Sequence, residues 1–190
     1  MAESPASARE RIMETSLRLF YQNGIRATGI DRIIAESGVA KMSFYRNFPS
    51  KKDLVAEFLK RRHEFWMNWF SGRVGELRAE GATGLTVLTD ALEEWFREPT
   101  FRGCAFINIV AEPGEESERV LAQEHKESLR QFILGLLPAT DASRAGEYAD
   151  LALLIVEGAI VRAQMTGDPK AAAQARRLLG MLDTEWAKNS

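Results

Sequence analysis

Apolar residues recur at helical spacing along nearly the whole of this 190-residue chain, and this periodicity limits the possible folds more than any other feature. No run of alternating β-branched residues predicts a strand. Capping boxes at Ser7–Glu10 and Ser50–Asp53 predict two helix starts. Gly38 and Pro49 predict two helix ends. The expected fold class is all-α, with about nine helices.

Several shorter signals place individual helices. Thr28, with Asp31 three residues later, predicts the cap of a short second helix that ends at Gly38. A third helix is expected over residues 40–47, and a long fourth helix follows Ser50. Asp168–Pro169 predicts a cap followed by proline at the first position of the last helix.

The charge of the chain differs between its two parts. Residues 1–62 hold 12 Lys and Arg against 7 Asp and Glu, a net of +5, whereas residues 63–190 hold 13 against 20, a net of −7. Because Lys and Arg gain affinity for polyanions by releasing counterions from phosphate, the basic part favours a nucleic-acid partner. A scatter of surface charge is the alternative that charge alone leaves open.

Other bulk features favour a cytoplasmic protein. Cys104 is the only cysteine and cannot form an internal disulfide, which fits a reducing compartment. The longest strongly apolar run, at residues 151–161, is interrupted by Glu157 and is too short to cross a bilayer, so no membrane partner is expected.

The stretch GVAKMSFYRNFPSKKDL, residues 38–54, crowds basic and aromatic side chains into a short helix. Phe44 and Phe48 lie four residues apart on one face and are expected to anchor this helix to a small core. Cations, a tyrosine hydroxyl and small or flexible side chains occupy the opposite side, a composition typical of a helix that reads DNA. This outward side consists of Lys41, Met42, Ser43, Tyr45 and Arg46.

Three short helices, of which the second and third are joined by a tight turn that contains Gly38, predict a helix-turn-helix. The block ATGIDRIIAESGVAKMSFYRNFPSKKDL, after a helix ending in FYQNG, resembles the DNA-binding domain of the tetracycline-repressor (TetR) family of transcriptional regulators over about residues 9–58. This resemblance implies an all-α homodimer whose N-terminal domains bind a palindromic operator in double-stranded DNA. It also implies a C-terminal domain that dimerises and binds an inducer.

The resemblance assigns roles to individual positions. It implies phosphate contacts at Thr28, Tyr45 and Lys51, and it places Lys41, Met42 and Ser43 in the major groove. Gly29 and Met42 depart from the family pattern, which favours a hydroxyl residue and a small residue there, so the operator sequence is open. The expected DNA-binding residues are Thr28, Gly29, Lys41, Met42, Ser43, Tyr45, Arg46 and Lys51. Arg9 and Arg11 could also touch DNA from an N-terminal arm, or lie on an exposed helix surface.

The expected domains are residues 1–50, which bind DNA, and residues 51–190, which bind ligand and dimerise, with the long fourth helix joining the two. Aromatic residues in the second domain exceed what a small bundle needs, so some are expected to line a pocket with a few polar groups for a small apolar or aromatic inducer. The ligand candidates are Trp66, Phe70, Trp95, Phe106, Asn108, Glu112, His125, Phe132 and Gln164. The last two long helices carry the dimer candidates, which are Tyr148, Leu151, Ala152, Ile155, Ala159, Arg162, Leu178, Met181 and Leu182.

The expected function is a ligand-responsive transcriptional repressor. The alternative is a helical small-molecule-binding or scaffolding protein that no longer binds DNA. An enzyme is not expected, since no catalytic triad, metal cluster or phosphate loop is recognisable. No cofactor and no metal are expected, because Cys104, Glu112 and His125 lack ligand spacing on one helix.

Overall fold

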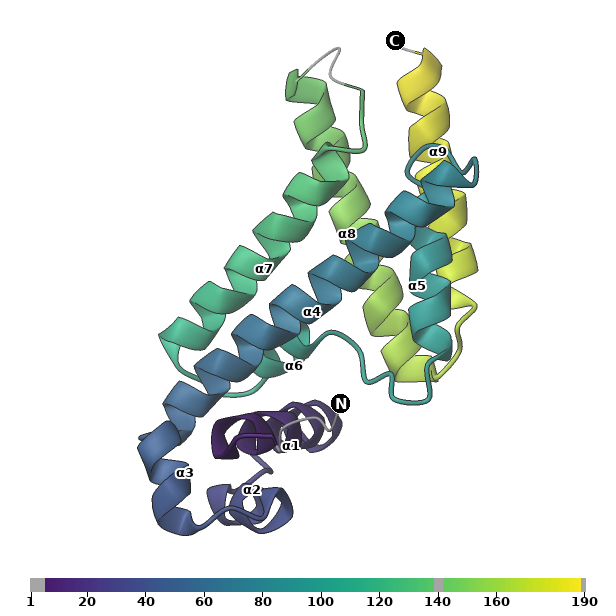
Figure 1. The fold of residues 1–190 in the computed structure, drawn as a ribbon. Coiled ribbons are helices and arrows are strands. Elements are labelled where there is room, and N and C mark those ends of the chain that lie inside the picture. Colours follow the sequence, from purple (N-terminus) through teal and green to yellow (C-terminus); the bar gives the residue numbers. More distant parts are fainter. Residues whose placement is uncertain (1–5, 139–141, 189–190) are drawn as a thin grey trace. The chain divides into compact units, whose positions relative to one another are not determined.

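The computed structural model describes residues 6–138 and 142–188, which fold into nine helices with no strand among them (Figure 1). This confirms the all-α prediction. None of the described helices is both long and apolar enough to span a bilayer. The helices are α1 (Ala8–Asn23), α2 (Ile30–Ser37), α3 (Lys41–Asn47), α4 (Lys51–Ala79), α5 (Val87–Arg97), α6 (Ala105–Ala111), α7 (Glu116–Leu134), α8 (Ala142–Thr166) and α9 (Ala171–Lys188).

The helices form two compact units that do not follow chain order. The first unit comprises Met1–Glu64 and Ala105–Ala122, and the second comprises Phe65–Cys104 and Gln123–Ser190. The boundary therefore falls inside α4, the helix expected to join the two parts, although it lies later than residue 50. Sequence order alone does not predict that α6 and the start of α7 belong with the N-terminal helices.

Local capping explains the ends of the N-terminal helices. The Ser7 hydroxyl accepts a hydrogen bond from the Glu10 amide at 3.1 Å, which starts α1 as expected. Gly38 follows α2 with φ of 63°, a left-handed conformation that glycine adopts without strain. The Ser50 hydroxyl accepts from the Asp53 amide at 3.2 Å at the start of α4. These three predicted boundaries are confirmed.

Large apolar side chains form the core of the first unit. Phe20 of α1 and Phe58 of α4 meet edge to face, with ring centroids 5.3 Å apart. Phe44 of α3 is fully buried, as is Ile33 of α2. Each such side chain stabilises the fold by about 1.5–3 kcal/mol when it leaves water, and together they hold four short or partial helices in place.

The second unit is a helical bundle in which α5, α8 and α9 contact one another (Figure 1). The Asp183 carboxylate of α9 accepts hydrogen bonds from the Leu85 amide at 2.8 Å and the Thr86 amide at 3.3 Å. These amides precede α5 and have no partner within that helix, so Asp183 acts as a remote cap. Gly84 has φ of 70°, and an added Cβ would meet the Asp183 carboxylate at 2.4 Å.

The start of the last helix differs from the prediction. Asp168 does accept a hydrogen bond, from the Lys170 amide at 2.9 Å, but Pro169 and Lys170 form a turn before α9 begins at Ala171. The Ala172 amide donates to the Pro169 carbonyl at 3.0 Å, an i to i+3 bond that tightens this turn. The expected proline at the first helical position is therefore wrong.

Arg9 of α1 holds the end of α3. Its Nη1 donates to the Asn47 carbonyl at 3.2 Å, and its guanidinium lies 4.5 Å from the centroid of the Phe48 ring. Its Nη2 lies 3.5 Å from a Glu57 carboxylate oxygen of α4. The Arg9 side chain therefore links α1 to α3 and α4. The sequence suggested only a DNA contact or an exposed position for this residue.

Replacing Arg9 tests this link. Arg9→Ala should lower the free energy of unfolding by about 1–2 kcal/mol, because it removes a hydrogen bond to a carbonyl and a cation–π contact. Arg9→Lys should recover only part of that loss, since an ammonium lacks the planar fork of a guanidinium. Urea denaturation followed by circular dichroism measures both. The control is Arg11→Ala, an exposed arginine on the same helix, which should change stability by about 0.5 kcal/mol or less; equal losses at both positions would contradict the link.

Candidate nucleic-acid interface

The third helix, α3, presents one apolar and one polar face. Phe44 and Phe48 are 0% and 2% exposed, and their ring centroids lie 6.3 Å apart. On the other side Met42 is 75% exposed and Tyr45 is 39% exposed. Arg46 is exposed as well. Because the buried phenylalanines prevent rotation of the helix, these outward side chains are displayed in a set direction, as the sequence predicts.

Other parts of the predicted recognition face are engaged within the protein. Lys41 Nζ lies 3.5 Å from the Asp31 carboxylate of α2, in an exposed ion pair that contributes little stability and can open. Ser43 is half-buried, and its carbonyl accepts from the Asn47 side chain at 2.8 Å. The tip of the helix therefore offers Lys41 and Met42 more freely than Ser43.

The structure corrects the role expected of Thr28. Its side chain is fully buried, and its hydroxyl donates to the Gly24 carbonyl at 2.7 Å. The hydroxyl therefore neither caps α2 nor reaches a phosphate. Gly29 is the residue that precedes α2, with no side-chain cap, and space for a side chain is open there. The spacing between Thr28 and Asp31 predicted that Thr28 caps α2. The Thr28 hydroxyl instead bonds carbonyls at the end of α1 and just after it.

Cations in the first half of α4 differ in their surroundings. Arg61 of α4 donates to the Glu10 carboxylate at 2.7 and 3.1 Å, and this hydrogen bonding lowers the pKa of Glu10. Burial lowers the pKa of the Lys51 ammonium, and repulsion from the Arg26 guanidinium lowers it further. Lys51 is thus a half-buried cation whose charge a nearby phosphate would stabilise.

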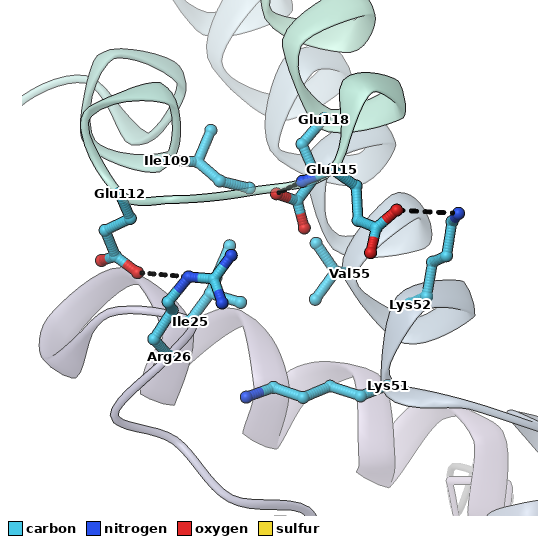
Figure 2. A pocket seen from close by; sticks show the side chains of 9 residues that line it. All are labelled: Ile25, Arg26, Lys51, Lys52, Val55, Ile109, Glu112, Glu115 and Glu118. Carbon is cyan, nitrogen blue, oxygen red and sulfur yellow. Dashed lines mark hydrogen bonds and ion pairs between the residues drawn. The ribbon is translucent and has the colours of Figure 1, made fainter.

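A pocket of about 240 Å³ opens beside Lys51, and its lining belongs wholly to the first unit. Figure 2 shows the Glu112 carboxylate beside Arg26 and the Glu115 carboxylate beside Lys52, with Lys51 and Glu118 also lining the pocket. The remaining lining is apolar and comes from α4, α6 and the turn after α1. The residues that line the pocket are Ile25, Arg26, Lys51, Lys52, Val55, Ile109, Glu112, Glu115 and Glu118.

Glu112 lies on this pocket, which corrects its place among the ligand candidates. A carboxylate oxygen of Glu112 lies 3.8 Å from Arg26 Nε, so the side chain faces the N-terminal helices. Phe106 and Asn108 also belong to the first unit, because α6 does. The sequence could not show this, because α6 follows α5 of the second unit and precedes α7, which begins in the first unit and continues in the second.

The other ligand candidates lie in the second unit, and most of them gather around Trp66. Its ring stacks on Phe70 at 4.7 Å between centroids and lies 5.3 Å from Trp95. His125 meets Trp66 edge to face at 5.5 Å. Trp66 is 5% exposed, and its indole N–H has no hydrogen-bond partner within the described residues. A buried donor left unpaired is unusual and costs about 1–3 kcal/mol.

Two further ligand candidates extend this aromatic group. The Phe132 ring lies 5.9 Å from Phe70. Gln164 is largely exposed, and its side-chain amide lies against Gly103, where an added Cβ would meet it at 1.9 Å. Phe101 was not predicted as a ligand residue, but its ring meets Trp95 edge to face, with centroids 5.0 Å apart. Phe101 lies in the loop after α5, where helical spacing of apolar residues cannot predict which side chains meet.

The dimer candidates divide by exposure. Leu151, Leu178 and Met181 are 41–54% exposed, as an interface residue should be in a single protomer. Ala152 and Ala159 are buried inside the protomer, so they support packing around α8 and are not available to a partner. Arg162 is exposed, whereas Ile155 and Leu182 are half-buried.

Tyr148 is another correction. It is 5% exposed and packs edge to face on Trp186, with ring centroids 5.1 Å apart. Leu154 and Met165 are the most exposed apolar side chains of α8, at 69% and 81%, and the list of candidates omitted both. Their spacing from Leu151 and Arg162 by three residues could have revealed them.

Comparisons with known proteins agree with this geometry. Residues 12–58 match the model of the family described as bacterial regulatory proteins, tetR family. The chain is 43% identical over 53 residues to the uncharacterized HTH-type transcriptional regulator YxaF of Bacillus subtilis, covering 28% of each chain. It is 28% identical over 85 residues to the HTH-type transcriptional repressor KstR2 of Mycolicibacterium smegmatis, covering 45% of this chain and 40% of that one. These alignments thus span less than half the length of either relative.

The fold is shared over a longer range. The crystal structure of SCO4454, a TetR-family transcriptional regulator from Streptomyces coelicolor, superposes with a TM-score of 0.79 and covers 96% of this chain and 91% of its own. At 24% identity this likeness concerns the fold. Residues 12–58 are therefore a helix-turn-helix segment of the tetR family of bacterial regulatory proteins, and the chain as a whole has the fold of TetR-family transcriptional regulators.

Proposed function

We propose that this regulator binds a palindromic operator in double-stranded DNA, with α3 in the major groove. The observation that carries the proposal is the exposed Lys41, Met42, Tyr45 and Arg46 face on a helix anchored from behind by Phe44. A helix held in this way can enter the groove without losing its orientation. The cytoplasm is where such a function would be carried out.

Phosphate and base contacts divide among these residues by chemistry. The Tyr45 hydroxyl and the Lys51 ammonium can reach backbone phosphate, and the amides at the start of α4 add donors oriented by the helix. Met42 can touch a thymine methyl but reads no hydrogen-bond pattern, whereas Arg46 can bond a guanine in bidentate fashion. We therefore assign the operator preference chiefly to Met42 and Arg46.

Loss of two phosphate contacts should weaken DNA binding. Tyr45→Phe combined with Lys51→Ala should reduce affinity for duplex DNA at least about tenfold and lower the slope of log affinity against log salt by roughly one. Fluorescence anisotropy across a salt series measures both quantities. The matched control is Lys60→Ala, an exposed lysine farther along α4, which should stay within about twofold of wild type. A wild-type slope near zero would indicate the alternative, a helical ligand-binding protein that no longer engages DNA.

We also propose that the protein acts as a homodimer through α8 and α9. Leu154 and Met165 on α8, with Leu178 and Met181 on α9, expose an apolar surface on two helices that pack against each other. Exposed apolar side chains that gather on one surface often mark a protein–protein interface. A second copy of the chain suits it, because two copies would bring two recognition helices to the two halves of a palindrome.

A charge on this surface should separate the protomers. Leu154→Glu should convert the dimer to a monomer, because pairing would bury an uncompensated carboxylate. Sedimentation velocity at micromolar concentration measures the state. Val120→Glu, at an exposed apolar position of the first unit, serves as the control and should leave the dimer intact. A monomeric wild type, or a dimeric Leu154→Glu variant, would refute this interface.

The inducer that we propose is a planar aromatic molecule with a hydrogen-bond acceptor. Stacked and edge-on rings around Trp66 suit an aromatic body, and the unpaired indole N–H would be satisfied by a ligand oxygen. Such a ligand would release the operator only if it binds the DNA-bound and free states differently. The repressor name of the relative KstR2 supports repression as the mode of regulation.

The indole N–H can be removed while an aromatic ring is kept. Wild type should bind 1-naphthoate more tightly than 1-methylnaphthalene, and Trp66→Phe should reduce that preference about tenfold or more, since a hydrogen bond to a charged group contributes about 1.5–3 kcal/mol. Isothermal titration calorimetry measures the four affinities. Trp69→Phe is the control and should keep the wild-type preference. An unchanged preference in Trp66→Phe would exclude the indole as the donor.

A further inference from the structure

The loop after α6 and the first turn of α7 bring carboxylates close to three cations of the first unit (Figure 2). Residues 112–118, named the acidic segment below, include Glu112, Glu115 and Glu118. A Glu115 carboxylate oxygen lies 3.3 Å from Lys52 Nζ, and Glu112 lies 3.8 Å from Arg26 Nε. Both ion pairs lie within the first unit, so they do not depend on how the two units are arranged.

Lys51 lies between these two ion pairs. Its side chain extends into the pocket, toward Arg26 (Figure 2). Burial and Arg26 disfavour its charged form, while Glu112 and Glu118 favour it. The acidic segment therefore stabilises positive charge at all three cations that surround this pocket.

Local structure holds the acidic segment where it is. The Glu115 amide donates to the Glu118 carboxylate at 3.1 Å, which caps the start of α7. Glu112 Oε1 would lie 3.2 Å from a Cβ at Gly24, whose φ of 85° also favours glycine. Ile109 of α6 and Val55 of α4, both buried, line the same pocket. The carboxylates are thus placed by backbone geometry and apolar packing, and not only by their charge.

We propose that the acidic segment competes with DNA phosphate for Arg26, Lys51 and Lys52, and so acts as an internal brake on DNA binding. This inference rests on the DNA-binding function proposed above. A carboxylate near a lysine neutralises the same charge that a phosphate would neutralise, so fewer counterions are released when DNA arrives. The brake lowers both the affinity for DNA and its dependence on salt.

The ion pairs of the acidic segment are weak enough for DNA phosphate to displace them. Lys52 and Glu115 are each 60% exposed, so water screens their attraction and the pair contributes little stability. DNA, with its dense row of phosphates, can displace such a carboxylate. Removal of the Glu115 charge should therefore change DNA binding while the fold remains intact.

The test compares two variants, each of which replaces one glutamate of the acidic segment by glutamine. Glu115→Gln removes the partner of Lys52, whereas Glu116→Gln removes a charge one residue away that lies 3.7 Å from Arg119 and is 82% exposed. Both substitutions change the net charge equally, so long-range effects are matched. Affinity of the full-length protein for a random-sequence DNA duplex is measured by fluorescence anisotropy across a salt series.

Glu115→Gln should bind about three- to tenfold more tightly than wild type at low salt, with a slope steeper by up to about 0.9, the value for one additional phosphate contact. Glu116→Gln should stay within about twofold of wild type. Combining Lys52→Ala with Glu115→Gln should abolish the gain, because the released cation is then absent.

The possible results separate this inference from the proposed function. If wild type binds DNA and the two glutamine variants behave alike, the brake is refuted while DNA binding stands. Persistence of the full gain in the Lys52→Ala combination would also refute it, because the effect would not pass through that lysine. If wild type and every variant fail to bind the duplex at low salt, the proposed function and the brake fail together.

Discussion

Burial of Phe44 and Phe48 is the interaction on which the rest of the first unit depends. The helix that carries them, α3, has only seven residues, and an isolated helix shorter than about 12–15 residues is marginal in water. It persists because these two rings are almost fully buried. Arg9 then stabilises its last turn by bonding the Asn47 carbonyl and covering the Phe48 ring. Orientation of the outward face is a consequence of this packing.

Charged residues around this core serve the fold and, as we propose, DNA at the same time. Arg61 is held by Glu10, whereas Lys41 and Lys52 carry exposed ion pairs that can open. The distinction is physical: a bidentate pair with a half-buried arginine is worth more than a single contact in water. Lys41 and Lys52, with their exposed single ion pairs, therefore remain available to phosphate.

Much of the fold could be predicted from the sequence, because caps and periodicity are local. Ser7, Gly38 and Ser50 start or end helices through hydrogen bonds and backbone angles set within a few residues. Thr28 shows the limit, since its hydroxyl finds the Gly24 carbonyl of the preceding turn instead of a helix amide. Among the candidate site residues, the outward face of α3 was predictable from spacing, whereas the neighbours of Glu112 were not.

The sequence by itself determined the all-α class, the helix-turn-helix and which side of α3 is apolar, because these follow from residues close together in the chain. Only the tertiary structure decided that α6 and the acidic segment join the N-terminal unit, and that Glu115 faces Lys52. It also decided that Ala152 is buried while Leu154 is exposed. Such pairings depend on packing between distant segments, and helical periodicity carries no information about which distant surface a given face will meet.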